Sequence, residues 1–184
     1  IVMETLNEYD WVQIGGAIEH PEKGKIVDMS HGLEKFGIKN GYLKIYPVNG
    51  YGSEDILREV FEMEKPDAIL HYTDPRFWIW FYNMEAEIRR TMPIFYYNIW
   101  DDLPDPQYNE LYYRSCDLLM AISKQTYGIN RRLLPDYEDW QITYVPHGIS
   151  ARRFKKTDDE DVNLLEFNEE YGISDKKFKI LYSN

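Results

Sequence analysis

Trp100, Asp101 and Asp102 directly follow an apolar run that is typical of a buried β-strand. An indole ring offers a flat stacking surface and an N–H donor, and a carboxylate accepts hydrogen bonds from hydroxyl groups. Residues that follow the strands of a doubly wound parallel sheet lie at its carboxyl edge, where ligands bind in such sheets. We therefore expect Trp100 and Asp101 to be catalytic residues and Asp102 to be a binding residue. The alternative is that an aspartate caps the next turn and Trp100 fills the core.

A second candidate group is Asp74-Pro75-Arg76, which follows another apolar run. The planar guanidinium of Arg76 suits a carboxylate or a phosphate, and Asp74 suits a hydroxyl group. Tyr108 follows a proline-rich turn and is a candidate for the same binding site. The alternative is a plain helix start, with Asp74 as the cap, Pro75 in the first turn and Arg76 exposed.

Gly15-Gly16 and His147-Gly148 also stand after apolar runs. A glycine pair permits a close backbone approach, so Gly15 and Gly16 are binding candidates, although the pair lacks the rest of a phosphate-binding motif. His147 and Gly148 are expected to form the turn out of the last strand at an interdomain hinge or cleft, with direct ligand binding as the alternative.

No metal site is expected. His20 and His31 are isolated from other ligand types, and Cys116 is the only cysteine. A single cysteine excludes an intramolecular disulfide and favours a reducing compartment, so the expected location is the cytoplasm.

The residues above must be positioned by a series of short strands that alternate with segments of helical period. This alternation predicts an α/β fold with a Rossmann-like, doubly wound parallel sheet, because parallel neighbours require crossover connections. The expected strands are Trp11–Gly15, Tyr42–Val48, Ala68–Tyr72, Ile94–Ile99, Leu118–Ile122, Ile142–Val145 and Phe178–Tyr182.

Three helices between these strands are predicted from caps and apolar stripes. Ser53 begins a helix that ends before Pro66, and Asp74 begins one whose buried face runs from Phe77 to Ile88. Ser123 begins a third. Residues 2–7 are the tail of a helix that leads into the first strand, so we expect a further strand upstream of Ile1.

Composition limits the partners. The formal net charge is -11, which disfavours nucleic acid and anionic membrane surfaces. No run reaches the roughly 18 apolar residues that a membrane span needs. An acidic stretch follows Ser150, so we expect a domain over residues 1–149, a charged linker over 150–175 with a short helix from Asn163 to Tyr171, and the start of a second domain at 176–184.

Three segments in series, Pro93–Pro104, Ser115–Ser123 and Tyr144–Ile149, resemble the N-terminal domain of family 4 glycosyltransferases, which are retaining enzymes of GT-B architecture. The resemblance spans about residues 10–184. It departs from the family at Trp100, which stands where the family usually has a histidine that contacts the donor sugar.

The resemblance implies that residues 1–149 form the acceptor-side half of a GT-B enzyme and that 176–184 form the first strand of a donor-binding domain. It implies transfer of a sugar from a nucleotide-sugar donor to a glycan or small-molecule acceptor with retention, without a metal or other cofactor. The donor-binding parts would lie outside this chain, which would then be inactive alone.

Two alternatives stay open because a fold does not determine a function. One is a non-catalytic α/β domain that binds a small molecule or a glycan. The other is a receiver-type domain, which is disfavoured because no acidic cluster ends the first strand.

Overall fold

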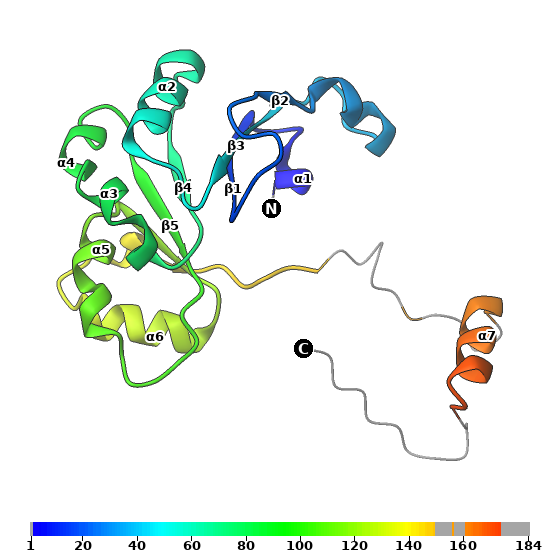
Figure 1. Cartoon of the computed structure of the whole chain (residues 1–184). Helices are drawn as coiled ribbons and strands as arrows, with labels where there is room; N and C mark the ends of the chain where they lie inside the picture. The colour runs from blue at the N-terminus through cyan, green and yellow to red at the C-terminus, as the bar shows by residue number, and fades with distance from the viewer. Residues whose placement is uncertain (1, 150–155, 157–160, 174–184) are drawn as a thin grey trace. The chain divides into compact units, whose positions relative to one another are not determined.

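The computed structural model describes residues 2–149, 156 and 161–173 (Figure 1). The chain divides into two compact units, Ile1–Pro146 and His147–Asn184. The second unit contains one described helix, α7 (Val162–Glu170), whose N-terminus is capped by the Asp161 side chain. All described strands belong to the first unit.

The first unit contains an all-parallel sheet with the strand order β4-β5-β6-β7. Its strands are β4 (Ile69–His71), β5 (Ile94–Asn98), β6 (Leu118–Ala121) and β7 (Ile142–Tyr144). Neighbouring strands are consecutive in the chain, and helices form the crossovers between them, as parallel pairing requires. The chain therefore has the α/β architecture that the alternation of strands and helices predicts.

A second, three-stranded sheet has the order β1-β3-β2. Strands β1 (Trp11–Ala17) and β3 (Leu43–Asn49) are parallel, and the two-residue strand β2 (Val27–Asp28) is antiparallel to β3. The sequence predicts one parallel sheet, so the separate sheet and the antiparallel β2 are corrections. Six of the predicted strands are confirmed, and the seventh, Phe178–Tyr182, lies outside the described residues.

Two longer helices begin at the predicted serine caps. Ser53 accepts a hydrogen bond from the backbone of Ile56 at the start of α2 (Glu54–Glu64), and Ser123 does the same for Thr126 at the start of α6 (Lys124–Leu133). These side chains satisfy backbone N–H groups that have no partner within the helix. Each helix thus begins where its local sequence predicts.

The segment after Asp74 differs from its prediction. It is divided into the 3-10 helix η2 (Pro75–Trp78) and the short helices α3 (Ile79–Tyr82) and α4 (Glu85–Ile88). Phe81 and Tyr82 occupy consecutive positions and are both buried, because they pack against the ring of His71 on β4. Phe77, which the helical period places on the buried face, is instead 52% exposed.

Two clusters of buried side chains form the core. The larger one lies between the four-stranded sheet and its helices, and each fully buried aliphatic side chain in it contributes about 1.5–3 kcal/mol. The smaller one joins the N-terminal segment to the first sheet through Leu6, Leu33, Ile38 and Leu43. Leu33 of this cluster lies in the 3-10 helix η1 (Ser30–Phe36), which has no counterpart among the predicted elements.

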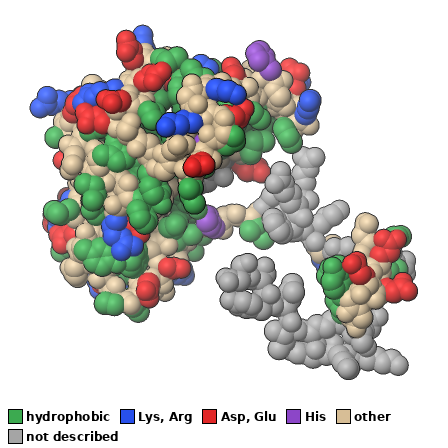
Figure 2. All heavy atoms as spheres, in the orientation of Figure 1, with side chains coloured by type: hydrophobic (Ala, Val, Ile, Leu, Met, Phe, Trp, Pro, Cys, Tyr) green, Lys and Arg blue, Asp and Glu red, His purple; other side chains and the backbone are tan. Residues whose placement is uncertain are grey.

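The remaining short elements are α1 (Val2–Thr5), η3 (Gln107–Asn109), α5 (Glu110–Arg114) and η4 (Asp139–Gln141). None of the helices in the described residues is both long and apolar enough to cross a membrane. Acidic and basic side chains are interspersed on the visible face of the first unit (Figure 2).

Candidate functional site

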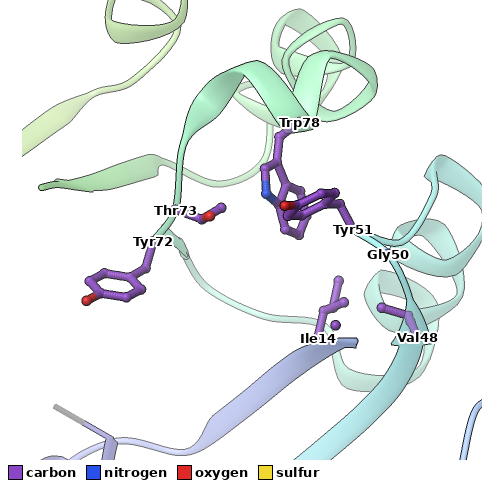
Figure 3. A pocket seen from close by; sticks show the side chains of 8 residues that line it. Ile14, Val48, Gly50, Tyr51, Tyr72, Thr73 and Trp78 are labelled. Atoms are coloured by element: carbon purple, nitrogen blue, oxygen red, sulfur yellow. The ribbon is translucent and has the colours of Figure 1, made fainter. Parts of the chain in front are cut away.

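A pocket of about 230 Å³ lies at the carboxyl ends of β1, β3 and β4. Figure 3 shows Ile14 and Val48 on one side of it and Trp78 and Tyr51 on another. This edge is where ligands bind in doubly wound sheets. The lining residues are Ile14, Gly16, Val48, Gly50, Tyr51, Tyr72, Thr73 and Trp78.

Aromatic rings form one wall of the pocket. Tyr51 stacks on Phe77 with the ring centroids 4.8 Å apart and an interplanar angle of 5°. The ring of Trp78 meets Tyr51 edge-on at 6.1 Å. Trp78 Nε1 is buried and has no hydrogen-bond partner among the described residues. A ligand with a flat or ring-shaped apolar face and a hydrogen-bond acceptor would suit this wall.

His71 lies behind the wall, at the end of β4. Its Nδ1 is 2.7 Å from the hydroxyl oxygen of Tyr82, and its ring stacks on Tyr96 at 5.1 Å and meets Trp78 at 5.2 Å. Burial lowers the pKa of His71 to about 4. The imidazole is therefore neutral near pH 7 and fixes the position of Trp78 without adding charge to the pocket.

Asp74 and Arg76 form an ion pair at the start of η2, immediately after Thr73 of the pocket. Arg76 Nε lies 3.0 Å from Asp74 Oδ1, and the same oxygen accepts a hydrogen bond from the backbone N–H of Arg76. These bonds hold the pKa of the Asp74 carboxyl below its usual range. Asp74 thus caps the start of η2, as the purely structural interpretation predicts. It is also the ion-pair partner of Arg76, a candidate binding residue.

The guanidinium of Arg76 also lies against two aromatic rings. Its central carbon is 5.8 Å from the ring centroid of Trp100 and 5.3 Å from that of Tyr108, and these two rings meet edge-on at 5.9 Å. Contacts of this kind attract a cation to the ring face and help to hold the guanidinium in place. The structure therefore brings the Asp74–Arg76 pair together with Trp100 and Tyr108, which lie in a separate, later segment of the sequence.

The neighbouring aspartates take other positions. The Asp101 side chain is exposed, and its backbone carbonyl accepts a hydrogen bond from Gln125 Nε2. Asp102 Oδ1 accepts from the backbone of Leu103, and its carbonyl accepts from the Trp100 indole N–H at 2.9 Å. The indole N–H is therefore engaged within the loop, whereas the ring of Trp100 remains part of the cluster.

The glycine candidates separate in the structure. Gly16 lines the pocket, and a Cβ atom placed on it would lie 2.3 Å from the carbonyl oxygen of Gly50. Gly15 is not among the lining residues; its missing Cβ makes room for Ile45 instead. Both glycines thus permit close packing between β1 and β3. His147 and Gly148 belong to the second unit, whereas the lining residues of the pocket all belong to the first, so a role for these two residues at a hinge or cleft stays a prediction.

Sequence reasoning missed Tyr51, Thr73 and Trp78. The rule that selects residues after strands would have found Tyr51, which is two residues after the end of β3, and Thr73, which is two residues after the end of β4. Trp78 carried no such signal, since its helical period places it in the core. Its role in the pocket depends on the fold of η2.

No group of His, Cys, Asp and Glu residues that could hold a metal ion occurs in the described part of the chain. Cys116 is buried, and burial raises the pKa of its thiol to about 12, so it is not a nucleophile at neutral pH.

No family model and no curated protein sequence matches the chain.

Proposed function

We propose that this chain is the acceptor-side domain of a glycosyltransferase that transfers a sugar from a nucleotide-sugar donor with retention. The observation that carries the proposal is the placement of an Asp–Arg pair among aromatic rings at the carboxyl edge of parallel strands. Sugars present apolar ring faces and adjacent hydroxyl groups. Rings that stack, together with one acceptor and one donor, suit both features.

In the proposed reaction the chain supplies orientation. Retaining transfer passes through an oxocarbenium-like state, which is stabilised by preorganised polar groups around the reacting sugar. Asp74 would accept a hydrogen bond from an acceptor hydroxyl, and Arg76 would donate one to a neighbouring oxygen. The aromatic wall would hold the ring and exclude water. Stabilisation of the departing nucleoside diphosphate is assigned to a donor-binding domain outside residues 1–149, as the GT-B resemblance implies.

The test is turnover by the full-length protein that contains this chain. Each of a panel of nucleotide sugars is incubated with the protein, and release of the nucleoside diphosphate is measured with and without mixed acceptor glycans. We expect one donor to give release of its nucleoside diphosphate, and we expect the rate of this release to increase when a suitable acceptor is added. No release with any donor would count against the proposal.

A matched pair of variants tests the role proposed for Asp101. Its side chain is exposed, so Asp101→Asn should leave the free energy of unfolding within about 0.5 kcal/mol of wild type. If Asp101 contacts the sugar, turnover falls by roughly tenfold or more. Asp67→Asn is the control and should retain turnover, because Asp67 is also exposed but precedes β4, at the end of that strand opposite the pocket.

A second candidate function is a glycan-binding module without catalysis. It is favoured because three polar groups near the site are already engaged or uncharged: Asp74 is ion-paired, His71 is neutral and buried, and the Trp100 indole N–H donates to the Asp102 carbonyl. Binding of acceptor glycans by the full-length protein, without turnover of any nucleotide sugar, would favour this function over the first.

A further inference from the structure

The end strands of the two sheets, β1 and β4, face each other across the pocket. Ile14 and Gly16 of β1 line the pocket, as do Tyr72 and Thr73, which follow β4. Figure 3 shows Ile14 and Thr73 on different sides of it. In the described part of the chain, β1 pairs only with β3, and β4 pairs only with β5. We refer to the space between these two strands as the β1–β4 gap.

The backbone groups along the gap can be assigned from the hydrogen bonds on the other side of each strand. Trp11 N–H donates to the Tyr42 carbonyl, so in a parallel pair the alternate residues Val12 and Ile14 direct their N–H and C=O groups away from β3 and into the gap. Ile69 N–H donates to the Pro93 carbonyl, so Leu70 likewise faces the gap.

Among the described residues no strand pairs with this side of β1 or of β4, although Val12, Ile14 and Leu70 are all partly buried. Unpaired backbone groups at partly buried positions are unfavourable, and native proteins pair nearly all of them. Both sides of the gap therefore present the hydrogen-bonding pattern of a sheet from which one strand is missing.

The two helices that flank this sheet lie on opposite faces. Tyr46 of β3 donates a hydrogen bond to Glu64 at the end of α2, which places α2 on the face of Tyr46. Trp11 of β1 donates to Thr5 at the end of α1. Trp11 pairs with Leu43, and Leu43 and Tyr46 point to opposite faces because side chains alternate along a strand. The helix that enters β1 is thus opposite to α2.

Handedness then selects the position of a strand preceding α1. The connection from β3 through α2 to β4 runs past β1 toward the gap. Crossovers between parallel strands are right-handed in nearly all proteins, so a helix on the opposite face must connect strands in the opposite direction. A strand joined to β1 through α1 therefore lies on the β4 side of β1, which is the gap. The other side of β1 is occupied by β3.

We propose that the β1–β4 gap is a site for one further β-strand, parallel to both neighbours and supplied by the polypeptide that precedes Ile1. This strand would join the two sheets into one, with the order β2-β3-β1-X-β4-β5-β6-β7, where X is the added strand. Because helices cover both faces, the strand should be a run of about five apolar residues. Its carboxyl end would open into the pocket beside Gly16 and Thr73.

The test compares residues 1–184 with the same chain preceded by roughly 20 residues of its own upstream sequence, enough for a strand and the start of the α1 helix. Residue-resolved NMR of the extended chain should show cross-strand contacts from one upstream segment to both Ile14 and Leu70. The amide protons of Ile14 and Leu70 should exchange with solvent at least roughly tenfold more slowly than in residues 1–184.

A proline at the centre of the upstream segment is the matched control, because it removes a backbone donor and should abolish the added protection. The cross-strand contacts in the extended chain give a direct readout even if residues 1–184 do not fold without the addition. Contacts from the upstream segment to neither Ile14 nor Leu70 would overturn the proposal. Protection of Ile14 in residues 1–184 that rises with protein concentration would also overturn it, since a second copy would then occupy the gap. Neither readout depends on glycosyl transfer.

Discussion

Arg76 is held by Asp74 and by the rings of Trp100 and Tyr108, so a single side chain joins three of the predicted site residues. The ion pair is partly exposed, with side-chain exposures of 48% for Arg76 and 26% for Asp74. Exposed pairs of this kind contribute less than about 1 kcal/mol to stability. We therefore expect this cluster to contribute more to ligand binding than to the stability of the fold.

We predict that Arg76→Ala weakens binding of the acceptor glycan by roughly tenfold or more, because a charge-assisted donor is lost. The free energy of unfolding should change by less than about 1 kcal/mol. Isothermal titration and urea unfolding measure the two quantities. Arg58→Ala is the matched control, since Arg58 pairs with Glu54 and Glu87 at similar exposure but away from the pocket. Equal loss of binding in both variants would contradict the assignment.

His71 gives a prediction about pH. Its pKa is about 4 in the folded protein and about 6.5 when exposed, because burial disfavours the charged ring. As pH falls from 6.5 to 4, the unfolded chain takes up a proton that the folded chain does not, so folding becomes less favourable. This difference in pKa lowers the free energy of unfolding by about 3 kcal/mol between pH 6.5 and pH 4.

The pH dependence is measured by urea unfolding at a series of pH values. The double variant His71→Phe/Tyr82→Phe should show a smaller decrease in the free energy of unfolding, because the titrating ring is gone and no tyrosine hydroxyl is left without its partner. Tyr82→Phe alone keeps the buried imidazole and should retain the decrease. An unchanged profile in the double variant would show that His71 is not the group responsible.

At the scale of elements, β1 and β3 approach closely where the pocket begins. A Cβ atom at Gly16 would lie 2.3 Å from the Gly50 carbonyl oxygen, which is backbone and cannot rotate away. We predict that Gly16→Ala lowers the free energy of unfolding by about 1–3 kcal/mol and distorts the pocket. Gly32→Ala is the control: no atom lies within 4 Å of its Cβ position, and its effect should stay within about 0.5 kcal/mol. Equal urea midpoints for the two variants would contradict the prediction.

The elements that the sequence predicts correctly are those whose signals are local. The caps of Ser53 and Ser123 and the apolar runs of β5 and β6 depend on residues within a few positions of each other. The two-residue strand β2 exists only through its pairing with β3, which a local pattern does not contain. The break between η2 and α4 likewise depends on the packing of Phe81 and Tyr82 against His71.

In the candidate site too, residues with a local sequence signal were predictable, and residues that depend on tertiary contacts were not. Asp74, Arg76 and Trp100 were predicted because each stands just after a strand, and their positions along the chain are sufficient to find them. Tyr51 and Trp78 could not be assigned together, because their contact joins the loop after β3 to η2 and requires the arrangement of both sheets. Gly15 was predicted as a binding residue, but its contact is with Ile45 of the neighbouring strand.

At the scale of the whole molecule, the chain consists of two compact units, Ile1–Pro146 and His147–Asn184. Every residue of the two core clusters lies in the first unit, and the last of them in the chain is Ile142. The pocket and the Asp74–Arg76 pair lie in the same unit. Within the part of the chain that the structure describes, the core and the binding surface of this unit therefore precede residue 147.

We predict that a chain ending at Pro146 keeps the thermal midpoint of residues 1–184 within a few degrees, because no member of either core cluster is removed. A chain ending at Gln141 is the matched control. It loses β7 and with it Ile142, whose exposed fraction is 1%, and truncating a core isoleucine even to alanine costs about 2–5 kcal/mol. Calorimetry of the three chains should therefore give two similar midpoints and one that is much lower. A large decrease for the chain ending at Pro146 would show that residues after it contribute to the stability of the first unit.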